Sequence, residues 1–141
     1  MAAVTANQLL EAKNAGCRIA AKAAGSQNLY ANTLAFSASG YASGDDSGGS
    51  NPFLGVVVDQ VDNSSGSAGD LDAELYTEGV FYLTGSSFTQ GTVGSAIYAV
   101  DNYTVQTSGS SASRVGTCVE FVSSTKIGVL ISPQVDIDTD T

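Results

Sequence analysis

The sequence contains no histidine and no tryptophan, and only five of its 141 residues are lysine or arginine. Without histidine the chain has no imidazole for acid–base catalysis, for a Ser-His-Asp triad or for a histidine metal site. The 14 acidic residues give a net charge of −9, whereas a nucleic-acid-binding surface needs basic side chains to displace counterions. These absences exclude histidine-dependent enzymes and predict that no nucleic acid is bound.

Cysteines and long apolar runs are also scarce. The two cysteines, Cys17 and Cys118, are too few for a secreted scaffold built on disulfides. Both fall in expected strands, where a buried thiol behaves as a small apolar side chain, and whether they pair stays open from the sequence. No run of 18 apolar residues occurs, and the N-terminal segment lacks the apolar stretch of a signal peptide. We therefore expect a soluble protein that binds no membrane.

Acidic residues are the only abundant candidates for chemistry. Asp59, Asp62, Asp70 and Asp72 flank one loop, and such oxygen ligands suit calcium. Their spacing differs from the D-x-[DN]-x-[DN]-G pattern of a calcium loop, so acids that solvate a turn are the favoured interpretation. No carboxylate pair is singled out for glycoside hydrolysis. We expect no catalytic residues, no metal and no cofactor, and hence no enzyme.

Alternating apolar and polar residues dominate the sequence after residue 16, and turn residues separate the alternating runs. This pattern predicts nine or ten short strands. A turn is expected at 25–28, a bend at Gly79 and a two-residue hairpin turn at Asp101 and Asn102. The expected strands are 17–23, 29–36, 53–61, 71–78, 80–83, 95–100, 103–107, 115–122 and 126–132. The predicted fold class is all-β, a compact antiparallel β-barrel or β-sandwich.

The N-terminal segment differs from the rest of the chain in charge and in periodicity. Residues 1–22 carry three basic residues and one acidic residue, whereas residues 23–141 carry two basic and 13 acidic residues. Residues 6–15 alone have helical character, and so short a helix is marginal without packing. We expect an extended or short-helical arm at 1–16, a β domain at 17–133 and an acidic tail at 134–141. The arm is interpreted either as a frayed terminus or as a segment that holds a partner.

An ordered series of short motifs covers most of the chain, from residue 17 to residue 131. The series comprises 29–34 (LYANTL), 40–42 (GYA), 53–64 (FLGVVVDQVDNS), 79–81 (GVF), 93–94 (VG), 97–102 (IYAVDN), Val105, 115–116 (VG) and 127–131 (IGVLI). In this order and spacing the chain resembles the capsid cement or decoration proteins of tailed bacteriophages, small β-rich proteins that bind the outside of the capsid shell. It departs from that family at Glu78, where the family is associated with basic residues, and in a Gly/Ser-rich loop at 45–51.

The resemblance implies a non-enzymatic virion protein that is assembled in the host cytoplasm and sits on the outer surface of the expanded head. There it would clamp neighbouring copies of the major capsid protein, as a homotrimer near three-fold positions. The family has no catalytic residues to transfer. From the charge and apolar residues of the arm and its junction with the β domain, we expect capsid contacts at Leu9, Leu10, Lys13 and Arg18. The alternative is a carbohydrate-binding or adhesive β module, suggested by six tyrosines and long polar loops.

Overall fold

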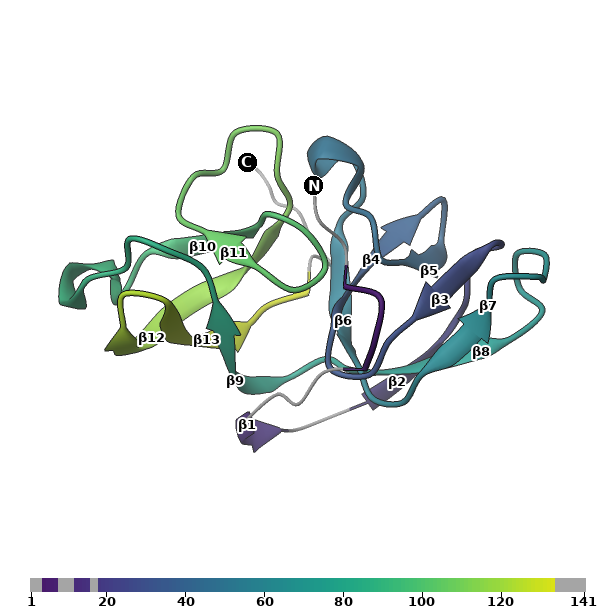
Figure 1. The fold of residues 1–141 in the computed structure, drawn as a ribbon, viewed down its shortest axis with the longest axis horizontal. Coiled ribbons are helices and arrows are strands. Elements are labelled where there is room, and N and C mark those ends of the chain that lie inside the picture. Colours follow the sequence, from purple (N-terminus) through teal and green to yellow (C-terminus); the bar gives the residue numbers. More distant parts are fainter. Residues whose placement is uncertain (1–3, 8–11, 16–17, 134–141) are drawn as a thin grey trace.

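A computed structural model of the chain describes residues 4–7, 12–15 and 18–133, with the backbone alone for 12–15. These residues form 13 β-strands and two short 3₁₀ turns, arranged in three antiparallel sheets (Figure 1). The described part contains no α-helix. The all-β prediction is therefore confirmed, and the sheets pack face to face in a sandwich-like arrangement with no closed barrel.

The largest sheet has six strands in the order β1-β9-β13-β12-β10-β11. It occupies one half of the molecule in Figure 1, with β1 at its lower edge. Its strands are β1 (Ala12–Ala15), β9 (Gly79–Thr84), β10 (Ala96–Ala99), β11 (Val105–Gln106), β12 (Arg114–Ser123) and β13 (Lys126–Ile131).

The other half contains a five-stranded sheet in the order β2-β8-β6-β4-β5 and a two-stranded sheet of β3 and β7. The strands of the five-stranded sheet are β2 (Arg18–Lys22), β4 (Leu34–Ala38), β5 (Tyr41–Ser43), β6 (Phe53–Val57) and β8 (Asp72–Tyr76). The two-stranded sheet consists of β3 (Gln27–Leu29) and β7 (Val61–Asn63). The 3₁₀ turns, Ser47–Gly49 and Gln90–Thr92, lie in connecting loops.

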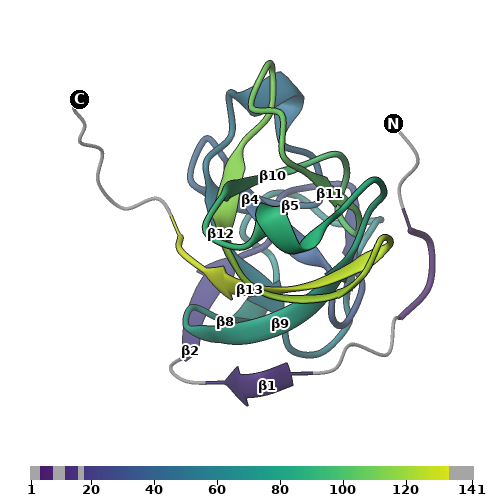
Figure 2. The ribbon, with the colours of Figure 1, turned by 90° about the vertical axis from the view of Figure 1, so that its left-hand side faces the viewer.

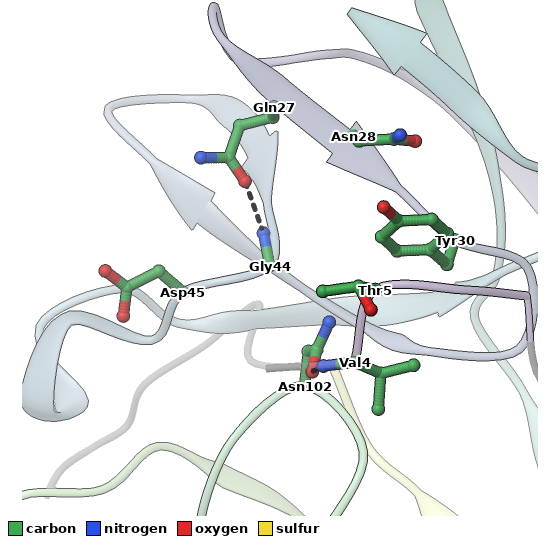
Figure 3. Close-up of a pocket in the computed structure, with 8 residues that line it drawn as sticks. All are labelled: Val4, Thr5, Gln27, Asn28, Tyr30, Gly44, Asp45 and Asn102. Carbon is green, nitrogen blue, oxygen red and sulfur yellow. Dashed lines mark hydrogen bonds between the residues drawn. The ribbon is translucent and has the colours of Figure 1, made fainter. Parts of the chain in front are cut away.

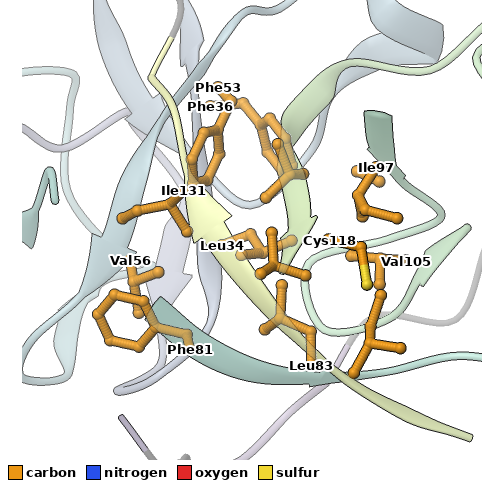
Figure 4. Packing of buried hydrophobic residues seen from close by; sticks show 14 of the residues in the cluster. Leu34, Phe36, Phe53, Val56, Phe81, Leu83, Ile97, Val105, Cys118 and Ile131 are labelled. Atoms are coloured by element: carbon orange, nitrogen blue, oxygen red, sulfur yellow. The ribbon is translucent and has the colours of Figure 1, made fainter. Parts of the chain in front are cut away.

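The main hydrophobic core lies between the six-stranded and five-stranded sheets (Figure 4). Phe36 and Phe53, on neighbouring strands, meet edge to face with ring centroids 5.9 Å apart. Each fully buried side chain of this size stabilises the fold by about 1.5–3 kcal/mol. The cluster comprises Leu34, Phe36, Phe53, Val56, Phe81, Leu83, Phe88, Ile97, Ala99, Val105, Val115, Cys118, Ile127, Val129 and Ile131.

The five-stranded sheet is the middle layer, because both of its faces are covered. On β4, Phe36 belongs to the main core and Ala35 to a second cluster, and on β6, Val56 and Val57 divide in the same way. The second cluster lies under the two-stranded sheet and comprises Ala23, Leu29, Ala35, Ala42, Val57, Ala73 and Leu75. A strand buried on both faces reads as a continuous apolar run. The prediction of a central strand beginning at Phe53 is confirmed, since β6 is the middle strand of this sheet.

Two glycines lie at positions that favour or require glycine, and one of them is Gly79, where a bend was expected. A Cβ added at Gly55 would overlap the carbonyl oxygen of Tyr76 on the neighbouring strand β8, so close backbone approach requires glycine there. Gly79 has a φ of 129° and lies where the chain leaves β8 in the middle sheet and begins β9 in the large sheet. Left-handed φ values of this kind favour glycine.

Two expected strands are divided in the structure. The run 29–36 is broken by a turn in which Asn32 has a φ of 65° and the Thr33 hydroxyl donates to the Tyr30 carbonyl at 2.7 Å. As a result, β3 before the turn and β4 after it belong to different sheets. The run 53–61 ends as a strand at Val57 and resumes as β7 at Val61. Alternation alone misses such breaks because the residues on both sides keep a strand pattern.

The expected helical character of residues 6–15 is wrong for the residues that the structure describes there. Residues 4–7 contain no helix, and Ala12–Ala15 forms β1, which pairs antiparallel with β9 and places Ala15 opposite Gly79 (Figure 2). An isolated helix of this length is marginal, whereas the edge of β9 offers unpaired backbone N–H and C=O groups. At these four positions the arm is therefore extended.

The hairpin expected at Asp101 and Asn102 is present, but its connection is longer than two residues. β10 and β11 pair with Ala99 opposite Val105, so residues 100–104 connect them. The Asp101 carboxylate accepts hydrogen bonds from the N–H groups of Tyr103 and Thr104, both at 2.8 Å. None of residues 100–104 takes a positive φ, so the left-handed backbone of a two-residue hairpin turn is not used here.

Candidate functional site

The four residues expected to contact a capsid are not brought together within the described structure. Leu9 and Leu10 lie outside the described residues, and Lys13 is described only as part of the β1 backbone. Arg18 begins β2, at the edge of the middle sheet. Only Arg18 therefore has side-chain contacts to report.

The Arg18 side chain lies against two residues of β8. Its Nη1 is 3.5 Å from Glu74 Oε2, its Nη2 donates to the Tyr76 hydroxyl at 3.3 Å, and its guanidinium carbon is 4.9 Å from the Tyr76 ring centroid. The Tyr76 phenol, assisted by Glu74, raises the pKa of Arg18 above its ordinary value. Lys22 forms a second ion pair with Asp72 at 3.6 Å. Two of the three basic residues in 1–22 are thus paired with acids of the body.

A pocket of about 480 Å³ lies where the N-terminal segment crosses the body (Figure 3). This volume is within the range of about 300–1,000 Å³ that is common for small-molecule sites. The pocket brings together four separate parts of the chain: the N-terminal segment, β3 with the turn after it, the loop after β5 and the connection from β10 to β11. Its lining residues are Val4, Thr5, Gln27, Asn28, Tyr30, Gly44, Asp45 and Asn102.

Local structure fixes the positions of the residues that β3 and the β5 loop contribute. The turn expected at 25–28 is shorter than predicted, because Ser26 takes a φ of 58° and β3 begins at Gln27. In the β5 loop, the buried carboxylate of Asp46 accepts hydrogen bonds from the N–H groups of Gly48 at 3.2 Å and Ser113 at 3.1 Å. These bonds tie the loop that carries Asp45 to the segment before β12.

The N-terminal segment, residues 4–7, is held to the body near both of its ends. The Val4 N–H donates to Asn102 Oδ1 at 3.0 Å. Asn7 accepts a hydrogen bond from the Ala31 N–H at 2.9 Å and donates to Gln60 Oε1 at 3.3 Å. The segment therefore forms a wall of the pocket by specific polar contacts.

Three amide side chains line the pocket with their oxygens engaged and their nitrogens available. Gln27 Oε1 accepts from the Gly44 N–H at 3.2 Å, Asn28 Oδ1 accepts from Gln60 Nε2 at 3.0 Å, and Asn102 Oδ1 accepts from Val4. These bonds fix which end of each amide is the oxygen. None of the three amide nitrogens donates a hydrogen bond within the described part of the chain. Asn102 is only 5% exposed, so its unpaired donor requires a partner in the pocket.

Three of the four acidic residues that flank the loop between Asp59 and Asp72 make contacts that stabilise turns or ion pairs. Asp62 accepts hydrogen bonds from the hydroxyl and the N–H of Ser64, and these bonds lower the pKa of Asp62. Asp70 Oδ2 accepts from the Ser67 N–H at 2.8 Å, and Asp72 is paired with Lys22. Across residues 4–7, 12–15 and 18–133, no group of three or more His, Cys, Asp or Glu side chains is placed to hold a metal ion.

Cys118 is a free, buried thiol in the main core. Its sulfur lies 3.6 Å from the Glu120 carbonyl, and burial raises the pKa of the thiol above its ordinary value. Cys17 lies outside the described residues. In the part of the chain that the structure covers, no helix has the length and apolar character needed to cross a membrane.

Sequence reasoning did not identify the pocket, although each of its amides lies in or beside a segment that was recognised as a turn. Asn102 belongs to the predicted hairpin turn, and Gln27 and Asn28 belong to the predicted turn at 25–28. A cluster of amides at turns is a weak signal, since Asn is common there for conformational reasons. Their convergence depends on the packing of segments far apart in the chain.

The chain was compared with protein-family models, with curated proteins and with solved structures, and none of the three comparisons found a match.

Proposed function

We propose that this protein is a capsid decoration protein that binds the outer surface of an expanded phage head and stabilises the shell. The observation that carries the proposal is where the motifs of the resemblance fall on the fold. The motifs that begin at Phe53, Gly79, Ile97 and Ile127 coincide with β6, the start of β9, β10 and β13. These strands enclose the main core, so the likeness concerns the framework of the domain.

A candidate contact surface lies on β12 and β13. Val119, Val122 and Leu130 are 42%, 45% and 47% exposed, although all three are large apolar residues. Apolar contacts suit a protein with a net charge of −9, because they do not require a basic patch on the coat. With the arm residues Leu9, Leu10 and Lys13, this surface would contact the major capsid protein.

The proposed mechanism is thermodynamic linkage. A ligand that binds the assembled shell and not its dissociated subunits shifts the equilibrium toward the shell. If three copies associate at a three-fold position, each trimer engages several coat subunits at once, and weak individual contacts combine into firm attachment. No catalytic group is needed for this role.

Co-sedimentation with phage heads tests the proposal. Purified protein is mixed with expanded heads of the source phage that have been stripped of decoration, and unexpanded proheads serve as the control. Saturable binding to the expanded heads alone is the expected result. No binding to either form by folded protein would refute the proposal.

A matched pair of variants tests the contact surface. Leu130→Ser removes an exposed apolar side chain from β13, and Leu71→Ser removes one of similar exposure, 43%, from the loop before β8. We expect Leu130→Ser to weaken binding to expanded heads by about tenfold, because Leu130 would lie within the contact surface. Leu71→Ser should leave binding unchanged, because Leu71 lies outside that surface. Equal effects of the two variants would show that β13 is not the contact surface.

A further inference from the structure

We infer that the pocket beside the N-terminal segment binds a neutral saccharide. This is a second binding property, separate from capsid decoration, and it does not rest on that proposed role. It follows from the hydrogen-bonding groups, the charge and the shape of the eight lining residues.

The unpaired donors in the pocket favour a ligand rich in oxygen acceptors. Gln27, Asn28 and Asn102 each present an amide nitrogen that has no acceptor within the described residues, and each is held in that orientation by the bond to its oxygen. In Figure 3 the Asn102 nitrogen points toward Gly44, and the Tyr30 hydroxyl lies on the side of its ring that faces Asn28. Asn102 is buried, and a buried amide nitrogen left unpaired is costly, so an oxygen-bearing ligand that pairs it gains affinity.

The charge of the pocket selects a neutral ligand. Of the eight lining residues, one is acidic, Asp45, and none is basic. Phosphates, nucleotides and acidic sugars would lack a cationic partner and would be repelled by a protein of net charge −9. A neutral hydroxyl group fits this lining, because it accepts from an amide nitrogen and carries no charge that needs a cationic partner.

The remaining lining residues supply the apolar contacts that a sugar ring needs. Tyr30 is half-buried and places its ring on one side of the pocket, and Val4 lines the pocket beside Asn102 (Figure 3). The C–H faces of a pyranose pack against such surfaces while its hydroxyl groups contact the amides. Small-molecule sites typically combine a small number of precisely placed polar groups with apolar surface.

Binding is tested with the full-length protein by titration with defined neutral saccharides. Glucose, galactose, mannose and N-acetylglucosamine, and a short oligosaccharide of each, are added while backbone amide shifts are recorded by NMR. Sialic acid serves as the anionic control. We expect saturable shifts at the pocket residues with at least one neutral sugar and none with sialic acid. Comparing the monosaccharide titrations with the oligosaccharide titrations distinguishes a site for single sugars from one that needs a longer glycan. Binding in either series supports the inference.

Two variants and their controls place the binding at this pocket. Asn102→Asp keeps the oxygen that accepts from Val4 and replaces only the donating nitrogen, and Gln90→Glu adds the same charge at an exposed position outside the pocket. Tyr30→Ala removes the ring, and Tyr41→Ala removes one that does not line the pocket. We expect the two pocket variants to weaken binding at least tenfold and the two controls to change it less than twofold.

The inference is overturned if no neutral saccharide produces saturable shifts in folded protein, or if the shifts occur away from the pocket. It is also overturned if sialic acid binds as well as the neutral sugars do. An Asn102→Asp variant that has lost its fold is recognised from its spectrum, and Tyr30→Ala, at a half-buried position, then carries the test. Because no capsid is present, the result does not depend on the proposed decoration role.

Discussion

At the scale of single residues, the fold depends on a few positions where backbone geometry or a side-chain hydrogen bond restricts which residue can be present. Gly55 lies where a side chain would overlap a carbonyl oxygen of the neighbouring strand, and Asp46 and Asp101 use carboxylates to satisfy backbone N–H groups in loops. Their identities are set by geometry that the local sequence does not display. Of the three, Asp101 was singled out from the sequence as part of the expected hairpin turn, whereas the role of Asp46 and the carbonyl oxygen that Gly55 faces became visible only in the structure.

Gly55→Ala provides a direct test of close packing between β6 and β8. The added methyl group forces a backbone shift in the middle sheet, and overpacking of this kind costs about 1–3 kcal/mol. The measurement is the free energy of unfolding in urea. Gly91→Ala is the matched control, since a Cβ there meets only Thr89 Oγ1 at 3.5 Å. Equal stability of Gly55→Ala and the wild type would contradict the described pairing.

Cys118 is expected to resist alkylation in the native protein. Burial raises the pKa of its thiol above 9.0, and the thiolate is the reactive form. The stability contributed by the neutral thiol is complete below pH 9.0 and declines as the pH rises through the higher folded pKa. Treatment with iodoacetamide at pH 8, followed by peptide mass mapping, should modify Cys118 only after denaturant is added. Rapid modification of native Cys118 would show that the core is open there.

At the scale of elements, the strands were predictable where alternation was regular, and the breaks between them were not. The β12–β13 hairpin and β8 follow the predicted runs closely, because one face of each is buried and the pattern is clear. The division of 29–36 and the strand character of Ala12–Ala15 were missed. Both features depend on partners that are distant in the sequence. The turn at Asn32 forms because β3 and β4 pair in different sheets, and β1 forms because β9 offers an open edge. The pocket was missed for the same reason.

Deletion of residues 1–16 tests the arm as an element. No described residue of the arm belongs to either core cluster, so the domain should stay folded and lose about 1–2 kcal/mol from the β1–β9 hydrogen bonds. Binding to expanded heads should weaken, because Leu9, Leu10 and Lys13 are removed. Circular dichroism checks the fold and co-sedimentation checks the binding. Unchanged occupancy of the heads by the truncated protein would remove the arm from the contact surface.

At the scale of the whole molecule, negative charge is concentrated in the part of the chain beyond residue 22. The body beyond residue 22 holds 13 of the 14 acidic residues, and Arg18 and Lys22 are paired with Glu74 and Asp72 on its surface. An acidic protein of this kind repels its own copies in solution. In the proposed decoration role, attachment to a shell would then rely on apolar contacts and on several copies acting together.

The salt dependence of binding to expanded heads follows from this distribution. Because exposed charges are screened beyond about 10 Å at 0.1 M salt, an electrostatic attachment would weaken steeply as salt is raised. We expect the Kd for expanded heads to change less than about threefold between 0.05 M and 0.5 M sodium chloride, as apolar contacts require. A steep loss of affinity with salt would instead assign the attachment to Lys13 and the other basic residues.

In the proposed role this protein stabilises an assembled shell, and the thermal disassembly of expanded heads measures that stabilisation. Light scattering is recorded while undecorated heads are heated with increasing amounts of the protein. Linkage predicts that the disassembly temperature rises with occupancy and stops rising when the sites are full. A disassembly temperature that stays constant at full occupancy would show that the protein binds without clamping, and an absence of binding would refute the decoration role itself.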